Sequence, residues 1–317
     1  MMNTDEKFYY LIGGILCLLV ISSLIGFILK YTVKGENKKP VIDNLNTRIN
    51  AWWLMIAFLV AAYLMGNAVT IILFAFISFF ALREFITLTP TKVSDYYTLS
   101  ICFFILIPAQ YILIALHWYG LMAIFIPVYA FLLLPAISAL AQDTEGFLER
   151  SARIQWATMI TIYCISYAPA LLILDIPGYK ENGLLLFYLL LVVQISDVLQ
   201  YVFGKLFGKR KIAPIVSPSK TVEGLVYGGL SASVVGGLMW WITPFNPLQS
   251  FLMAFIIVIM GFLGGLTLSA IKRGLGAKDW GTMVKGHGGM LDRMDSICFA
   301  APIFFHIVRY YFSLSLI

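Results

Sequence analysis

Charge is scarce in this chain. Asp, Glu, Lys and Arg make up only 12% of its 317 residues, whereas 61% of the residues are hydrophobic. Soluble proteins carry about 25% charged residues, so this chain has too few charges to cover a surface that faces water. The scarcity argues against a soluble globular protein. It favours a membrane protein built from apolar helices of about 20 residues.

Cysteine and long polar segments are scarce as well. The four cysteines, Cys17, Cys102, Cys164 and Cys298, lie in or beside apolar runs and show no C-x-x-C spacing. We interpret them as small packing residues rather than as metal ligands or disulfides. The sequence also contains no internal repeat, no low-complexity segment and no loop long enough for a soluble domain.

What the chain does contain is a series of long apolar runs. They predict an all-α fold, a polytopic transmembrane helical bundle of about ten spans. The predicted spans are residues 8–29, 51–66, 68–88, 97–116, 119–140, 156–174, 183–203, 224–243, 250–271 and 296–315. The first run is too long for a signal peptide and follows Asp5 and Glu6, so we expect a retained helix. Only Gly66-Asn67 divides the second and third runs, which leaves a nine-span alternative.

The basic residues are distributed unevenly between the two sides of this predicted bundle. If the N-terminus is outside, all 22 Lys and Arg residues except Lys7, Lys180 and Arg309 fall on the inner side. The positive-inside rule predicts this asymmetry, and a nine-span chain would destroy it. We therefore prefer ten spans. The net charge of +6 is then a topology signal and an attraction for anionic membrane lipids, not for nucleic acid.

The polar motifs gather in the second half of the chain. We divide it into N-terminal transmembrane helices, residues 1–180, and a catalytic transmembrane region, residues 181–317. In that region Gln194, Asp197, Tyr201 and Lys205 are spaced to share one helical face. A carboxylate inside a membrane span is a functional hypothesis by default. The alternative is that Asp197 only pairs with Lys205.

Hydroxyls and a lysine stand directly before the span at 224–243. The residues are Ser217, Ser219, Lys220, Thr221 and Glu223. Such a group at a helix N-terminus can bind phosphate, although the same residues also serve as ordinary helix caps and loop residues. Glycines in the following span, at positions 224, 228, 229, 236 and 237, are expected to allow close helix packing.

The segment 269–295 alternates basic residues and carboxylates across a glycine-rich loop. Its polar members are Ser269, Lys272, Arg273, Lys278, Asp279, His287, Asp292, Arg293 and Asp295. Phosphoryl chemistry requires this mixture, because carboxylates hold Mg²⁺ while Lys and Arg neutralise phosphate charge. Asp292 and Asp295 share a face at the start of the last span. His287 is either a solvated loop residue or a phosphate hydrogen-bond donor.

This segment resembles the signature of the phosphatidate cytidylyltransferase (CDP-diacylglycerol synthase) family. The family pattern is S-x-x-K-R, four residues, K-D-x-G, a gap, and H-G-G-x-x-D-R-x-D. Every fixed position is met between Ser269 and Asp295. The upstream stretch from Asp197 to Gly224 is similar to the same family, so the resemblance covers residues 190–315.

The resemblance implies that a cytidylyl group passes from CTP to phosphatidic acid or a related lipid phosphate. The products would be CDP-diacylglycerol, in phospholipid biosynthesis, and pyrophosphate, with Mg²⁺ as cofactor. It implies catalytic roles for Asp197, Lys205, Lys272, Arg273, Lys278, His287 and Arg293, substrate binding by Ser217, Ser219, Lys220, Thr221, Glu223 and Ser269, and metal binding by Asp292, Asp295 and Asp279. The expected location is a bacterial inner membrane with the site facing the cytoplasm, and the glycine-rich spans permit a homodimer.

The chain departs from the family just before the signature. The family usually reads Gly-Asp-Leu-x-Glu-Ser, whereas residues 264–269 read Gly-Gly-Leu-Thr-Leu-Ser, so the two acids are replaced by Gly265 and Leu268. Gln200 also stands where the family more often has Ala. Asp197, Asp279 and Asp295 remain as substitute metal ligands. These departures leave open a non-catalytic or altered-substrate paralogue that binds lipid or partners. Ten spans would also permit a transporter, although the polar residues gather at one membrane face.

Overall fold

The computed structural model describes residues 4–32, 39–283 and 288–313, and most of these residues are helical. The first three helices are α1 (Thr4–Thr32), α2 (Lys39–Leu64) and α3 (Asn67–Leu88). The middle of the chain consists of η2 (Val93–Asp95), α4 (Tyr96–Ile101), η3 (Cys102–Leu106), α5 (Ile107–Ala115), α6 (Tyr119–Ile124), η4 (Phe125–Ala130), α7 (Phe131–Leu140), α8 (Phe147–Thr158), η5 (Met159–Cys164), α9 (Ile165–Ala170) and η6 (Leu171–Ile173).

The last part of the chain holds the polar motifs. It comprises α10 (Asn182–Phe207), strands β1 (Lys211–Ala213) and β2 (Ser217–Thr221), η7 (Gly224–Gly228), α11 (Gly229–Leu238), η8 (Trp240–Ile242), α12 (Pro247–Gly274), α13 (Leu291–Val308) and η9 (Arg309–Ser313). The strands pair antiparallel, with Lys211 opposite Thr221. The all-α expectation is therefore met except for this small hairpin, which lies in a segment predicted to be only a polar loop.

Seven helices of the described residues are long and apolar enough to cross a membrane, which indicates an integral membrane protein. They are Glu6–Thr32, Asn67–Leu88, Val93–Ala115, Tyr119–Leu140, Phe147–Ile173, Asn182–Phe207 and Pro247–Gly274. Two further apolar helices, Trp52–Leu64 and Gly224–Leu238, are shorter. The eighteen-residue α13 begins with the charged residues Asp292, Arg293 and Asp295. The predicted count of ten spans is thus not confirmed, although α2 and α3 do separate at Gly66.

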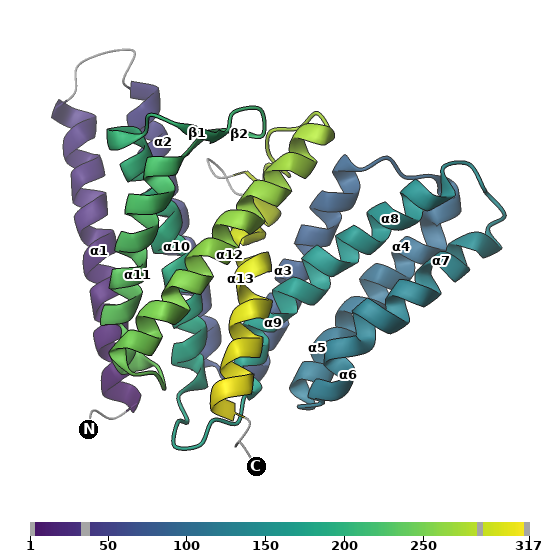
Figure 1. Ribbon diagram of the computed structural model, residues 1–317, viewed down its shortest axis with the longest axis horizontal. Coiled ribbons are helices and arrows are strands. Elements are labelled where there is room, and N and C mark those ends of the chain that lie inside the picture. Colours follow the sequence, from purple (N-terminus) through teal and green to yellow (C-terminus); the bar gives the residue numbers. More distant parts are fainter. Residues whose placement is uncertain (1–3, 33–38, 284–287, 314–317) are drawn as a thin grey trace.

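The helices run between two ends of the molecule (Figure 1). The start of α1 and the end of α13 lie at the bottom of the view, whereas β1, β2 and the end of α12 lie at the top. We call the top the hairpin end, defined by residues 211–221. Helices α4 to α8 form an arm on the right, while α3, α12 and α13 occupy the centre. The hairpin end carries the residues from which the site is built.

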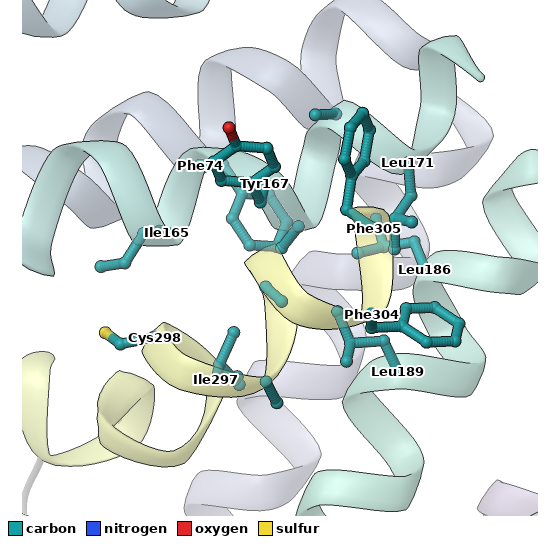
Figure 2. Close-up of a cluster of buried hydrophobic side chains, with 14 of the residues drawn as sticks. Phe74, Ile165, Tyr167, Leu171, Leu186, Leu189, Ile297, Cys298, Phe304 and Phe305 are labelled. Atoms are coloured by element: carbon teal, nitrogen blue, oxygen red, sulfur yellow. The ribbon is translucent and has the colours of Figure 1, made fainter. Parts of the chain in front are cut away.

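Helix α13 forms the centre of the apolar core (Figure 2). Its Phe304 and Phe305 are essentially inaccessible to solvent, as are Tyr167 of α9, Leu186 of α10 and Phe74 of α3. Close packing of large side chains such as these is what holds membrane helices together. The core therefore joins both halves of the chain around the helix that carries the end of the signature.

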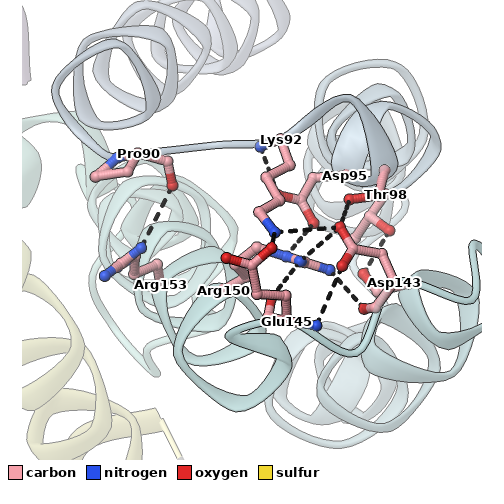
Figure 3. A network of polar contacts seen from close by, with 10 residues as sticks. Pro90, Lys92, Asp95, Thr98, Asp143, Glu145, Arg150 and Arg153 are labelled. Atoms are coloured by element: carbon pink, nitrogen blue, oxygen red, sulfur yellow. Dashed lines mark hydrogen bonds and ion pairs between the residues drawn. The ribbon is translucent and has the colours of Figure 1, made fainter.

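A buried arginine, Arg150, connects segments of the right-hand arm through hydrogen bonds and ion pairs (Figure 3). The Arg150 guanidinium donates to Asp95 at 3.1 Å and to Asp143 at 2.9 Å. Arg150 is 5% exposed, so this basic residue, counted as a topology signal in the sequence, also compensates buried charge. The hydroxyl of Ser94, then the Glu145 main-chain N–H and the Arg150 guanidinium, lower the Asp143 pKa to about 2. The network fixes the loop between α7 and α8 against α4.

Candidate active site

Two carboxylates meet at the hairpin end, from helices that are far apart in the sequence. The Ser296 hydroxyl, on α13, lies 3.1 Å from Asp197 Oδ2 on α10 and 3.4 Å from Asp295 Oδ1. Asp295 also accepts from the Ser296 main-chain N–H at 2.7 Å. The Asp197 side chain is exposed and Asp295 is half-buried, so a ligand can reach the pair. Two carboxylates this close together are an acceptor group that suits a positively charged partner.

Lys220 reaches from β2 toward this carboxylate pair. Its ammonium donates to the Phe262 carbonyl at 3.3 Å and lies 4.6 Å from the centre of the Phe262 ring. Burial lowers the Lys220 pKa, while the carboxylates of Asp197 and Asp295 act in the opposite direction. A Cβ added at Gly265 would lie 2.9 Å from the ammonium and 3.8 Å from Asp295 Oδ2. Glycine at position 265 therefore leaves room for the lysine beside the acids.

Lys272 and Asp292 form a buried ion pair next to this group. The ammonium of Lys272 donates to Asp292 Oδ1 at 2.6 Å, and the two side chains are only 9% and 7% exposed. The other oxygen of Asp292 accepts from the main-chain N–H groups of Trp280 and Gly289, both at 2.8 Å. Asp292 thus holds Lys272 together with the main chain at Trp280 and Gly289.

Glu84, in the N-terminal half, holds the main chain at the start of α13. Its carboxylate accepts from the main-chain N–H groups of Met290 at 2.8 Å and Leu291 at 2.9 Å. These groups open α13, where main-chain donors have no partner within the helix. The sequence prediction missed Glu84 because the N-terminal helices were assigned no motif. An acidic residue within a long apolar run was the available signal.

Several predicted site residues have other partners within the chain. Lys205 is exposed, with its ammonium 5.7 Å from the centre of the Tyr201 ring, and it makes no ion pair with Asp197. Glu223 accepts from the N–H groups of Lys209 and Arg210 at 3.0 and 3.1 Å. Through these hydrogen bonds Glu223 holds the residues just before β1 in place. The pairing of Asp197 with Lys205, left open by the sequence, is not the arrangement found.

Other members of the predicted set lie at helix ends or on the surface. Thr221 accepts from the Gly224 N–H at 3.1 Å, Ser269 donates to the Gly265 carbonyl at 2.6 Å, and Arg273 donates to the Ala277 carbonyl at 2.9 Å. Ser219, Lys278 and Asp279 are exposed, while Ser217 and Arg293 are half-buried. His287 lies outside the described residues. The roles of all these residues stay predictions.

The glycines after the hairpin do allow close packing. A Cβ at Gly224 would lie 2.7 Å from the Gln200 carbonyl oxygen, and one at Gly228 would lie 2.5 Å from the Gln200 nitrogen. A Cβ at Gly236 would lie 2.4 Å from the Ala254 Cβ. These contacts hold η7 and α11 against α10 and α12, which brings Lys220 to the acids. Gly224, Gly228 and Gly236 pack against other helices of the same chain. They are therefore not available for the helix contacts of the homodimer that the sequence permits.

Comparison with known proteins gives a family. The cytidylyltransferase family matches residues 46–311. A protein of Escherichia coli (strain K12), "Uncharacterized protein YnbB", is 36% identical over 302 residues, which is 94% of this chain and 97% of that protein. The chain belongs to the cytidylyltransferase family. The match begins at residue 46, so the resemblance placed at 190–315 extends over most of the N-terminal helices.

Other relatives of this cytidylyltransferase family member are named for an enzymatic activity. The phosphatidate cytidylyltransferases of Staphylococcus haemolyticus (strain JCSC1435) and Staphylococcus aureus (strain COL) are 40% and 41% identical over 128 residues. That stretch is 39% of this chain and 49% of each enzyme, so the match spans about half of their length. The match to those enzymes thus covers part of each chain, whereas the match to the Escherichia coli protein covers nearly the whole of both chains.

The family resemblance implies Mg²⁺ as cofactor. The carboxylates of the site are compatible with one way of binding this metal. The described part of the chain holds no group of three or more His, Cys, Asp or Glu side chains arranged around one point. Asp292 is already occupied by Lys272 and two main-chain N–H groups. Asp197 and Asp295 remain, and Mg²⁺ commonly takes one or two carboxylates and completes its shell with water and phosphate. The site suits a metal that arrives with a nucleotide.

Proposed function

We propose that this protein transfers a cytidylyl group from CTP to phosphatidic acid or a related lipid phosphate, releasing pyrophosphate. The observation that carries the proposal is the convergence of Asp197, Lys220 and Asp295 beside the ion pair of Lys272 and Asp292. Family membership and the partial likeness to phosphatidate cytidylyltransferases support it. The product would be CDP-diacylglycerol, made for phospholipid biosynthesis in a bacterial cytoplasmic membrane with the hairpin end inside.

The reaction requires little covalent chemistry from the protein. An oxygen of the lipid phosphate forms a bond to the α-phosphorus of CTP, and the bond from that phosphorus to the β-phosphate oxygen breaks, so pyrophosphate leaves. Positioning and neutralisation of charge supply the catalysis. Lys220 is placed to neutralise phosphate oxygens. Asp197 and Asp295 would hold Mg²⁺, which when bound withdraws charge from the phosphates.

The direct test is a turnover assay with purified protein in lipid nanodiscs. We expect incorporation of CMP into phosphatidic acid with equal release of pyrophosphate, and a requirement for CTP and Mg²⁺. Diacylglycerol, which lacks the phosphate, serves as the negative control. Asp197→Asn should lower kcat by about 100-fold, since it removes one of the two carboxylates that would hold Mg²⁺ at the reacting phosphates. Glu149→Gln, on an exposed pair with Arg153, should leave kcat unchanged. Absence of turnover on every lipid phosphate offered would overturn the proposal.

A second candidate is a non-catalytic paralogue that binds lipid or partners. Gly265 and Leu268 favour it, because both are buried at positions where the family carries acids. Leu268 is completely buried and has no charge to offer a metal. On this hypothesis the cellular role survives Asp197→Asn and Asp295→Asn. Complementation of a deletion strain by both variants would favour the paralogue, and failure of both would favour the enzyme.

A further inference from the structure

Glu84 is the place where the N-terminal half of the chain touches the signature. Its oxygens accept from two consecutive main-chain N–H groups, Met290 and Leu291, across more than 200 positions of sequence. We propose that Glu84 is a positioning residue for the cytidylyl transfer. By holding the first turn of α13, it places Asp292 and, through Asp292, the ammonium of Lys272. This inference rests on the proposed function.

Three consecutive amides at the start of α13 are divided between two carboxylates. The Gly289 N–H donates to Asp292, while the Met290 and Leu291 N–H groups donate to Glu84. A carboxylate at a helix N-terminus also interacts favourably with the helix dipole. With all three donors engaged, the backbone beside Asp292 has little freedom to turn. The orientation of the Asp292 carboxylate toward Lys272 therefore depends on Glu84.

Two glycines pack directly against the Glu84 carboxylate. A Cβ at Gly289 or Gly281 would lie 2.3 Å or 2.8 Å from a Glu84 oxygen, so both glycines accommodate the carboxylate. The neighbouring Phe85 stacks on Trp280, with ring centres 5.0 Å apart and planes 18° apart. Trp280 in turn donates its main-chain N–H to Asp292. Helix α3 thus contacts Trp280 and the start of α13, next to the two main-chain N–H groups that donate to Asp292.

The experiment compares Glu84→Gln, Glu84→Asp and the control Glu149→Gln. Glutamine keeps the size of the side chain but replaces one of the two carboxylate oxygens with an NH₂ group. That group cannot accept a hydrogen bond from a main-chain N–H. Aspartate keeps the charge and shortens the reach. We expect Glu84→Gln to lower kcat between about 10- and 100-fold with the KM for CTP changed by less than about threefold. Glu84→Asp should be intermediate, and Glu149→Gln should match the natural protein.

Two further readouts separate positioning from a general loss of fold. The kcat deficit of Glu84→Gln should persist at 10 °C on monodisperse protein, where a merely destabilised enzyme would recover. Hydrogen exchange should become faster in residues 288–295 and stay unchanged in α10. Exchange does not require activity, so it tests the attachment even if CTP turnover is absent. Unchanged exchange at 288–295, or a natural kcat in Glu84→Gln, would overturn the inference.

Discussion

Lys272 and Asp292 show why single residues matter in this site. Both side chains are below 10% exposure, and removing one partner of a buried pair leaves the other charge without compensation. We expect Lys272→Met to lower the free energy of unfolding by about 3–5 kcal/mol. Denaturant unfolding in detergent measures this.

The exposed pair of Arg153 and Glu149 is the control for that measurement. Arg153→Met should cost less than about 1 kcal/mol, because exposed pairs are worth little. The double variant Lys272→Met, Asp292→Asn should recover part of the loss, since the uncompensated charge is gone. A Lys272→Met protein as stable as Arg153→Met would show that the pair is not buried.

Gly265 is the second residue whose replacement tests the site. A Cβ there would lie 2.9 Å from the flexible end of Lys220 and no closer than 3.6 Å to Ser296 or Asp295, so the ammonium is the neighbour that must shift to admit a side chain. The new acid would stand beside Asp295 and act as a third ligand. We expect Gly265→Asp to lower the Mg²⁺ concentration for half-maximal turnover by about tenfold. A Mg²⁺ titration that is unchanged would mean that the metal is held away from position 265.

At the scale of elements, the contact between η7 and α10 decides whether Lys220 reaches the acids. Gly228 approaches the backbone of Gln200 so closely that any Cβ must push the helices apart. We expect Gly228→Ala to destabilise the protein by about 1–3 kcal/mol. Thermal unfolding measures the loss. Gly120→Ala is the control, since nothing lies within 4 Å of a Cβ at Gly120, and equal losses in the two variants would contradict the packing argument.

The hairpin has a predictable response to pH. The Lys209 N–H, followed by the Arg210 N–H, lowers the Glu223 pKa from 4.5 to about 2. A depressed carboxylate pKa means that its stabilisation is complete above pH 4.5 and is lost as the pH falls toward 2. The difference in unfolding midpoint between the natural protein and Glu223→Gln should therefore stay constant from pH 8 to 5 and shrink below pH 4.5. A difference that shrinks between pH 8 and 6 would contradict this assignment.

At the scale of the whole molecule, the prediction concerns sidedness. Ser219 lies on the hairpin and Lys180 lies in the loop before α10, at the other end of that helix, and both are exposed. From the distribution of basic residues we propose that the hairpin end lies inside. In intact cells, an impermeant thiol reagent should label Lys180→Cys and not Ser219→Cys. Permeabilised cells should label both. The reverse pattern would invert the proposed orientation.

The sequence by itself determined the class of molecule and the position of the signature. Scarcity of charge, apolar runs and helical spacing are local properties, so they identified lipid-facing helices without any contact being known. They also predicted correctly that the glycines of η7 and α11 allow close packing. The number of spans was not settled in this way. Trp52–Leu64 and Gly224–Leu238 are short, and α13 begins with charged residues.

Only the tertiary structure decided which of the polar residues meet. Asp197 and Ser296 are 99 positions apart, and Glu84 and Met290 are 206 positions apart. No local pattern encodes such pairs, because they arise from the packing of whole helices around α13. The same packing set Lys220 beside Gly265 and gave Glu223 and Thr221 structural partners. Charge composition is a sum over the chain, so it can be read from the sequence. A site depends on which side chains, distant in the sequence, lie close together in the folded molecule.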